Sequence, residues 1–119
     1  MAPYSFDFDC KALQFLYSGN IENTLVSRNS FRYSNQRCVV VEGTSNVTIS
    51  HNVAYQTFGH CIYLGYQSES NLIGNNLVSD TKSVGSHQIN GKTDNNPGSF
   101  LNWYNPNDYM YNIAVAGQR

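Results

Sequence analysis

Short apolar stretches of this chain are interleaved with Asn, Ser and Gly from one end to the other. No stretch of ten residues shows the apolar spacing of an amphipathic helix. The sixteen Asn and thirteen Ser lie among nine Tyr, six Phe and many branched aliphatic residues, which excludes a disordered polar chain. Such a composition is typical of strands joined by tight turns. The sequence therefore predicts an all-β fold.

The pattern repeats along the chain. Residues 18–29 align with residues 41–52 at an offset of 23, and the same offset extends beyond both segments. The aligned positions are Asn23 with Asn46, Val26 with Ile49, Ser27 with Ser50, Asn29 with Asn52, Cys38 with Cys61, and Leu16-Tyr17 with Val39-Val40, then Ile62-Tyr63.

Two further copies follow. Ile73 and Asn76 lie 24 positions after Ile49 and Asn52, and residues 107–114 form a fourth copy that comes about 13 residues late. The surplus falls in a stretch rich in Ser, Gly and Asn, which predicts an inserted loop near residues 83–97.

A period of 23–24 residues is too short for two helices, and it fits one turn of three short strands and three bends. A leucine-rich repeat needs Leu at fixed positions, and this chain has only seven Leu. A β-sandwich would give the apolar and Asn positions no shared register. We expect a parallel β-helix, or solenoid, of about four to five coils, with equivalent side chains stacked about 4.8 Å apart. Repeated Asn at one bend tolerates left-handed backbone and can form an amide ladder.

The length of 119 residues fits one domain, with residues 1–17 as an entry or cap with the first strand and residues 18–117 as the coils. The net charge is −1 and only seven residues are Lys or Arg, so no basic face for nucleic acid is expected. No apolar run approaches the length of a membrane span, so we expect no direct membrane insertion.

Once the coils are aligned, residues 52–64, 71–77 and 99–107 resemble the extracellular β-helix shared by cell-migration-inducing hyaluronan-binding protein, transmembrane protein 2 and the fibrocystins. The shared features are a Gly-His pair before an apolar strand, a Phe and Trp near Asn-Pro-Asn, and a closing Ala-Gly. The resemblance covers about residues 43–117. It implies a right-handed β-helix outside cells or on the cell surface. Some members of this family bind or depolymerise hyaluronan, and others are large surface or coat proteins with no known catalysis.

The chain departs from the family pattern after the Gly-His strand. The family often has an acidic Glu-Asp-Gly turn there, whereas this chain has Gly65-Tyr66-Gln67, and Glu69 is the only carboxylate nearby. Glycoside hydrolysis by the usual route needs two carboxylates about 5 to 9.5 Å apart. Glu42 and Glu69 lie near bends of neighbouring coils, and His60 is the first residue to mutate if activity appears. We assign none of them as catalytic, and we expect His60 to hydrogen-bond backbone at a corner.

The histidines and cysteines do not indicate a metal site. The three His do not stack in the alignment, and no Cys-x-x-Cys spacing occurs, so we expect no metal and no cofactor. Cys38 and Cys61 fall within disulfide distance, but parallel stacking points both side chains the same way. We therefore expect two stacked core thiols. Cys10 precedes the first clear coil and is available for an intermolecular pair.

Two stretches are candidates for contact with glycans. Asn46 begins a glycosylation sequon at the repeated bend, and it can carry a sugar only if it lies outside a buried ladder. Strand alternation places Trp103 and Tyr104 on opposite faces, so one of them can stack on a sugar ring while amides such as Asn105 bind its hydroxyls. The alternative is a core Trp103 with Tyr104 on the solvent face.

The open ends of a short solenoid expose unpaired backbone groups, so we expect this chain to be a fragment of a longer solenoid or to dock on a partner. The expected partners are further coils of the same protein or other protein chains, with glycan as a further contact. Two functions remain: a non-catalytic extracellular module with a structural or assembly role, or a depolymerising enzyme for hyaluronan-type polysaccharides. Sparse carboxylates and the missing acidic turn favour the first.

Overall fold

The computed structural model describes residues 12–34, 36–83, 97–103 and 106–117, and in these ranges the chain forms ten strands and no helix. The strands are β1 (Leu13–Ser27), β2 (Ser30–Arg32), β3 (Val39–Ser50), β4 (Val53–Phe58), β5 (Ile62–Leu64), β6 (Leu72–Gly74), β7 (Leu77–Lys82), β8 (Phe100–Asn102), β9 (Asp108–Met110) and β10 (Ile113–Val115). The predicted all-β class is confirmed.

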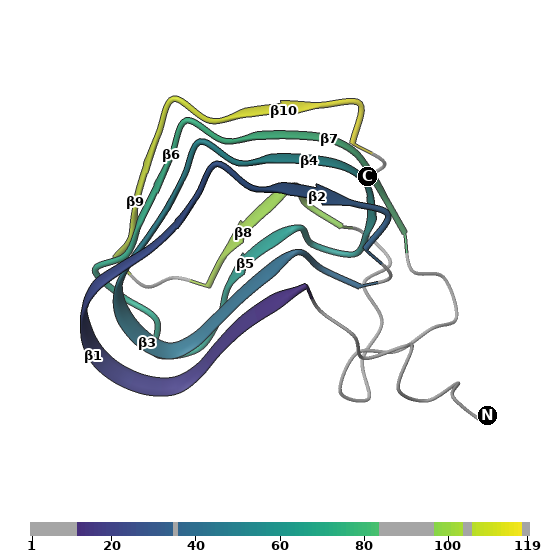
Figure 1. The fold of residues 1–119 in the computed structure, drawn as a ribbon. Helices are drawn as coiled ribbons and strands as arrows, with labels where there is room; N and C mark the ends of the chain where they lie inside the picture. Colours follow the sequence, from purple (N-terminus) through teal and green to yellow (C-terminus); the bar gives the residue numbers. More distant parts are fainter. Residues whose placement is uncertain (1–11, 35, 84–96, 104–105, 118–119) are drawn as a thin grey trace.

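All strand pairs between these elements are parallel. One sheet has the order β8-β5-β3-β6-β9, with β1 also paired to β3, and the second has the order β10-β7-β4-β2. Figure 1 shows that the long strands β1 and β3 curl around a bend, whereas later repeats use separate short strands along the same path. Segments about one repeat apart in sequence therefore lie side by side.

The register confirms most of the aligned repeats. Val26 lies opposite Ile49, and Ile49 lies opposite Ile73, at the predicted offsets of 23 and 24. The start of β1 differs from the prediction, because Leu13 lies opposite Val39 and Leu16-Tyr17 is displaced by three residues. Two irregularities within β1 absorb these extra residues before its second half. Among the described residues β1 pairs only with β3, and bulges of this kind are easily accommodated in such a strand.

The predicted insertion is present. The offset between paired strands rises from 24 at the Phe58–Lys82 pair to 38 at the Ile62–Phe100 pair, so 14 additional residues enter between Lys82 and Phe100. The offset is 36 at β9, because the connection from β8 to β9 is two residues shorter than that from β5 to β6. Most of the predicted loop 83–97 lies outside the described residues.

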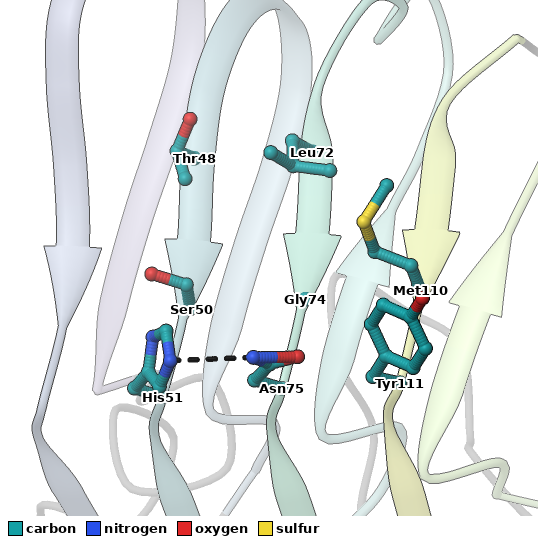
Figure 2. A pocket seen from close by; sticks show the side chains of 8 residues that line it. All are labelled: Thr48, Ser50, His51, Leu72, Gly74, Asn75, Met110 and Tyr111. Carbon is teal, nitrogen blue, oxygen red and sulfur yellow. Dashed lines mark hydrogen bonds between the residues drawn. The ribbon is translucent and has the colours of Figure 1, made fainter.

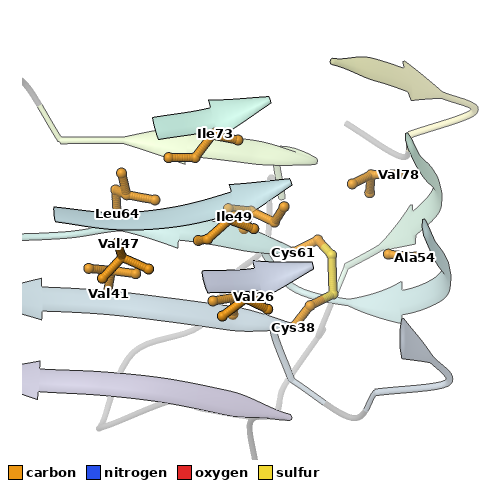
Figure 3. Close-up of a cluster of buried hydrophobic side chains, with 12 residues drawn as sticks. Val26, Cys38, Val41, Val47, Ile49, Ala54, Cys61, Leu64, Ile73 and Val78 are labelled. Atoms are coloured by element: carbon orange, nitrogen blue, oxygen red, sulfur yellow. A yellow bond between two sulfur atoms is a disulfide. The ribbon is translucent and has the colours of Figure 1, made fainter. Parts of the chain in front are cut away.

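The core consists of side chains that point inward at the same position of successive repeats. Val26, Ile49 and Ile73 stack along one sheet, and Ala54 and Val78 stack along the other. These side chains lie between the two sheets, as Figure 3 shows, and together with their buried neighbours they form one cluster. Burial of such apolar area contributes about 25 cal/mol for each Å² removed from water.

An asparagine ladder closes the corner between the two sheets. Its members are Asn29, Asn52, Asn76 and Asn112. The Nδ2 of each of the first three donates to the Oδ1 of the next, at 3.1, 3.0 and 3.0 Å. Their backbone N–H groups donate to the same oxygens at 2.9–3.0 Å. The amide ladder proposed for the repeated Asn is therefore present.

The ladder also satisfies backbone carbonyl groups. Asn52 Nδ2 donates to the carbonyl oxygen of Val26, and Asn76 Nδ2 donates to that of Ile49, both at 2.9 Å. Each ladder Asn follows a residue with left-handed φ, between 55° and 59°, in the column Arg28, His51, Asn75 and Tyr111. The left-handed residue turns the chain, and the Asn after it bonds the backbone groups that the turn leaves without a strand partner.

Replacement of Asn76 by Ala is expected to destabilise the fold by about 2–4 kcal/mol, because the side chain is only 2% exposed and its loss leaves the Asn52 N–H and the Ile49 carbonyl buried without partners. Urea unfolding followed by circular dichroism measures this. The matched control is Asn20→Ala, which removes a side-chain amide bond to Asn46 at the surface and should cost less than about 1 kcal/mol. Equal effects of the two variants would contradict the role of the buried ladder.

Because Tyr109 is partly buried, we expect the free energy of unfolding to depend on pH in the alkaline range. Its ring packs edge-on against Phe100, with centroids 6.4 Å apart, and burial raises its pKa from the usual 10 to about 12. Between these values the unfolded chain loses this proton and the folded chain keeps it, so the free energy of unfolding should fall as pH rises from about 10 to 12. Unfolding of Tyr109→Phe should be less sensitive to pH in this window. Tyr111→Phe, at an exposed ring, should behave like the parent, and an unchanged slope in Tyr109→Phe would be the contrary result.

Candidate functional site

His60 lies in the turn between β4 and β5 and is half-buried. The backbone N–H of Gly98 donates to its Nδ1 at 2.9 Å, which is a backbone hydrogen bond of the kind expected at this corner. The imidazole centroid is 5.9 Å from that of the buried Tyr63 ring, and the Arg37 guanidinium carbon lies 4.0 Å from the centroid of the same ring. Ring packing and the backbone hydrogen bond from Gly98 both fix the imidazole.

The two carboxylates considered for catalysis have different surroundings. Glu42 is half-buried on β3, and its side chain covers Gly65 so closely that a Cβ there would lie 2.8 Å from Glu42 Cγ. Glu69 is exposed in the connection from β5 to β6. The glycine that opens this altered turn is thus required by the packing of Glu42 and Tyr63, whose ring would be 2.7 Å from the same Cβ.

The candidate glycan contacts are only partly described. Trp103 follows β8, its backbone N–H donates to the Leu64 carbonyl at 2.9 Å, and its side chain is 40% exposed. Tyr104 and Asn105 lie outside the described residues. Asn46 is exposed, and its amide donates to the side chain of Asn20 rather than that of Asn23, so it stands apart from the buried ladder.

Cys38 and Cys61 form a disulfide, with Cα atoms 4.6 Å apart. The preferred interpretation of two stacked thiols was therefore wrong. Parallel stacking does align the two Cβ atoms, but rotation about each Cα–Cβ bond can turn the sulfur atoms toward each other. Cys10 lies outside the described residues.

A shallow groove of about 300 Å³ opens on the outer face of β3, β6 and β9. Gly74 forms its floor, Leu72 and Met110 flank it, and the Tyr111 ring lies at one end with its face turned outward (Figure 2). The side chains that line it are Thr48, Ser50, His51, Leu72, Asn75, Met110 and Tyr111.

The stacked register explains this groove. Ser50, Gly74 and Met110 occupy one column on the outer face, and the middle member has no side chain. In the next column, Asn75 Nδ2 lies 3.3 Å from His51 Nε2, and Tyr111 is 82% exposed. Sequence reasoning did not identify this site, although the aligned repeats place a glycine between a serine and a methionine, and place Asn75 between His51 and Tyr111.

Within the described ranges, no group of three or more His, Cys, Asp or Glu side chains is placed to hold a metal ion. The part of the chain with assigned structure also contains no helix long and apolar enough to cross a membrane.

Comparison with known proteins gives one family. The model of the family described as CEMIP beta-helix matches residues 2–118 of this chain. Three relatives come from Dictyostelium discoideum: Communication mutant protein F is 39% identical over 74 residues, a G8 domain-containing protein is 36% identical over 62 residues, and Protein rliB is 30% identical over 80 residues. These matches cover 61%, 50% and 66% of this chain but only 7%, 4% and 7% of the relatives. No solved structure matches significantly.

The disulfide gives a direct test by peptide mapping. In the Cys10→Ser variant, unfolded without reductant, Cys38 and Cys61 should resist alkylation and appear as one cross-linked peptide. Reduction should lower the free energy of unfolding by about 3 kcal/mol, because the bond joins residues 23 positions apart. Alkylation of both cysteines in protein isolated from its native compartment, before any reductant is added, would restore the interpretation of two thiols.

Proposed function

The chain belongs to the CEMIP beta-helix family, and from that premise we propose that it is a non-catalytic module of an extracellular or cell-surface protein. Its role is structural: it forms a section of a right-handed parallel β-helix of four to five coils. Its open edges pair with further coils of the same protein or with other protein chains.

The main support for this proposal is the exposed edge of β10. In the described part of the chain, β10 pairs only with β7, and its outer backbone edge is unpaired. Ala114 on β10 is exposed, although Val78 and Ala54, the equivalent side chains of the two preceding repeats, are buried. Ile113 is 58% exposed beside it. An unpaired edge next to an exposed inward-facing position such as Ala114 favours addition of another strand.

Two observations support a location outside the cell. A disulfide persists in oxidising compartments and is rare in the cytosol, and the Cys38–Cys61 bond lies in the core cluster. The sequon at Asn46 is exposed, and we propose it as a glycosylation site in the secreted protein.

The surroundings of the candidate catalytic groups support a role without catalysis. Glu42 packs over Gly65, Glu69 stands in solvent, and His60 Nδ1 accepts a backbone hydrogen bond. A tuned acid–base pair would hold its carboxylates against proton donors, whereas Glu42 covers a glycine and Glu69 faces solvent. We also propose that the surface around Trp103, Tyr104 and Asn105 contacts glycan, because the exposed Trp103 ring offers an aromatic face.

Assembly through the edge is tested by sedimentation of the 119-residue chain over a range of concentrations. The chain should associate, and Ala114→Lys should shift it toward monomer, because a charge at this position opposes burial under another strand. Tyr55→Lys is the matched control: Tyr55 is also exposed, but it lies on β4, which is paired on both sides, and association should persist. A parent chain that stays monomeric at all concentrations would contradict the assembly role.

The absence of catalysis is tested separately with high-molecular-weight hyaluronan. Its size distribution should not change after incubation with the folded chain. Shortening of the polymer that is lost in His60→Ala or Glu69→Ala would instead assign the chain to the depolymerising enzymes.

A further inference from the structure

We infer that the groove over Gly74 is a binding site for a neutral sugar ring, recognised by stacking on Tyr111 and by hydrogen bonds to Asn75 and His51. The groove lies on the outer face of β3, β6 and β9, so this proposal does not depend on assembly through the edge strands. It also concerns different residues from the surface around Trp103.

Neither the backbone conformation nor the packing requires a glycine at the floor of the groove. Gly74 is not among the residues with positive φ, and a Cβ there would meet only Met110 atoms at 3.5–3.6 Å, which is ordinary contact. A larger side chain therefore fits the backbone and the packing, as Ser50 and Met110 show at the paired positions. Glycine in a strand interior costs stability and often marks a close approach of a ligand.

The walls suit one kind of ligand. A pyranose ring has a face of C–H groups and a rim of hydroxyl groups, so it needs an apolar surface bordered by donors and acceptors. Leu72, Met110 and the outward face of the Tyr111 ring supply the apolar surface (Figure 2). The contact between Asn75 Nδ2 and His51 Nε2 leaves Asn75 Oδ1 and His51 Nδ1 for hydroxyl groups of a ligand.

The charge of the lining narrows the ligand class. None of the eight residues around the groove is Asp, Glu, Lys or Arg. A carboxylated or sulfated sugar would find no lysine or arginine in this lining to pair with its charge, and ion pairing or hydrogen bonding must compensate for the desolvation of such a group. The groove therefore favours an uncharged hexose or N-acetylhexosamine over a uronic acid. Its volume of about 300 Å³ is at the small end of ligand pockets, which limits it to one or two rings.

The test is a chemical-shift titration, observed by NMR on the full 119-residue chain, with methyl α-mannoside, methyl β-glucoside and N-acetylglucosamine, and with glucuronic acid as the charged comparison. At least one neutral sugar should bind with a dissociation constant of about millimolar, and it should shift the Met110 methyl and Tyr111 ring resonances. Two variants should each weaken this binding at least about tenfold. Gly74→Val fills the floor, and Tyr111→Asn removes the ring while keeping a residue that tolerates left-handed φ.

Thermal unfolding distinguishes lost binding from lost fold. Gly74→Val should keep the melting temperature or raise it by roughly 2–4 °C, because it replaces glycine in a strand. Tyr66→Asn, at an exposed tyrosine that does not line the groove, should bind sugar like the parent. The proposal is overturned if no neutral sugar shifts Met110 or Tyr111, if Gly74→Val retains binding, or if glucuronic acid binds equally well. Shifts at these residues that follow protein concentration alone and persist in Ala114→Lys would assign the groove to a second copy of the chain and also overturn it.

Discussion

Each repeat of this protein depends on one corner, where a left-handed residue turns the chain and the following Asn bonds the backbone of the neighbouring repeats. The corner between the two sheets interrupts the strand ladders, and its N–H and carbonyl groups would otherwise be buried without partners. The side chains of Asn52 and Asn76 each accept hydrogen bonds from the Asn of the preceding repeat. Each then donates to a backbone carbonyl of that same repeat and to the Asn side chain of the following repeat. Because the same residue type recurs in every copy, the corner aligns the repeats and sets the register of the strands on both sides.

This division of roles leaves the outer face free to vary. Inward positions are constrained by packing, as the buried stack of Ile49 on Ile73 illustrates, and the ladder positions are constrained by hydrogen bonds. The columns beside them contain residues as different as Ser50, Gly74 and Met110 without disturbing the strand pairs. The outward-facing side chains can therefore differ from repeat to repeat while the paired strands keep their positions. In this way a repetitive fold can form a binding site on its outer face.

Much of the fold could be predicted from sequence. The offset between equivalent Asn residues and the offset between equivalent apolar residues are the same from one repeat to the next, and this agreement defines the repeats. The offsets of 23 and 24 and the late fourth copy follow from this agreement. The start of β1 could not be predicted, since its irregularities occur where no ladder Asn fixes the alignment. The disulfide was missed because side-chain rotation is not visible in a repeat alignment. The groove was missed because Tyr111 alone does not indicate a site. The groove also needs the absent side chain of Gly74, which the strand register places beside it.

If the Asn ladder holds the repeats together, its backbone amides should be protected from hydrogen exchange. The backbone N–H groups of Asn52 and Asn76 donate to side-chain oxygens inside the ladder, at 2.9 and 3.0 Å. We expect these two amides to exchange as slowly as those of the core strands, at a rate set by global unfolding. Exchange as fast as that of the exposed turn at Tyr66 would show that the corner opens independently and that the ladder does not hold the repeats together.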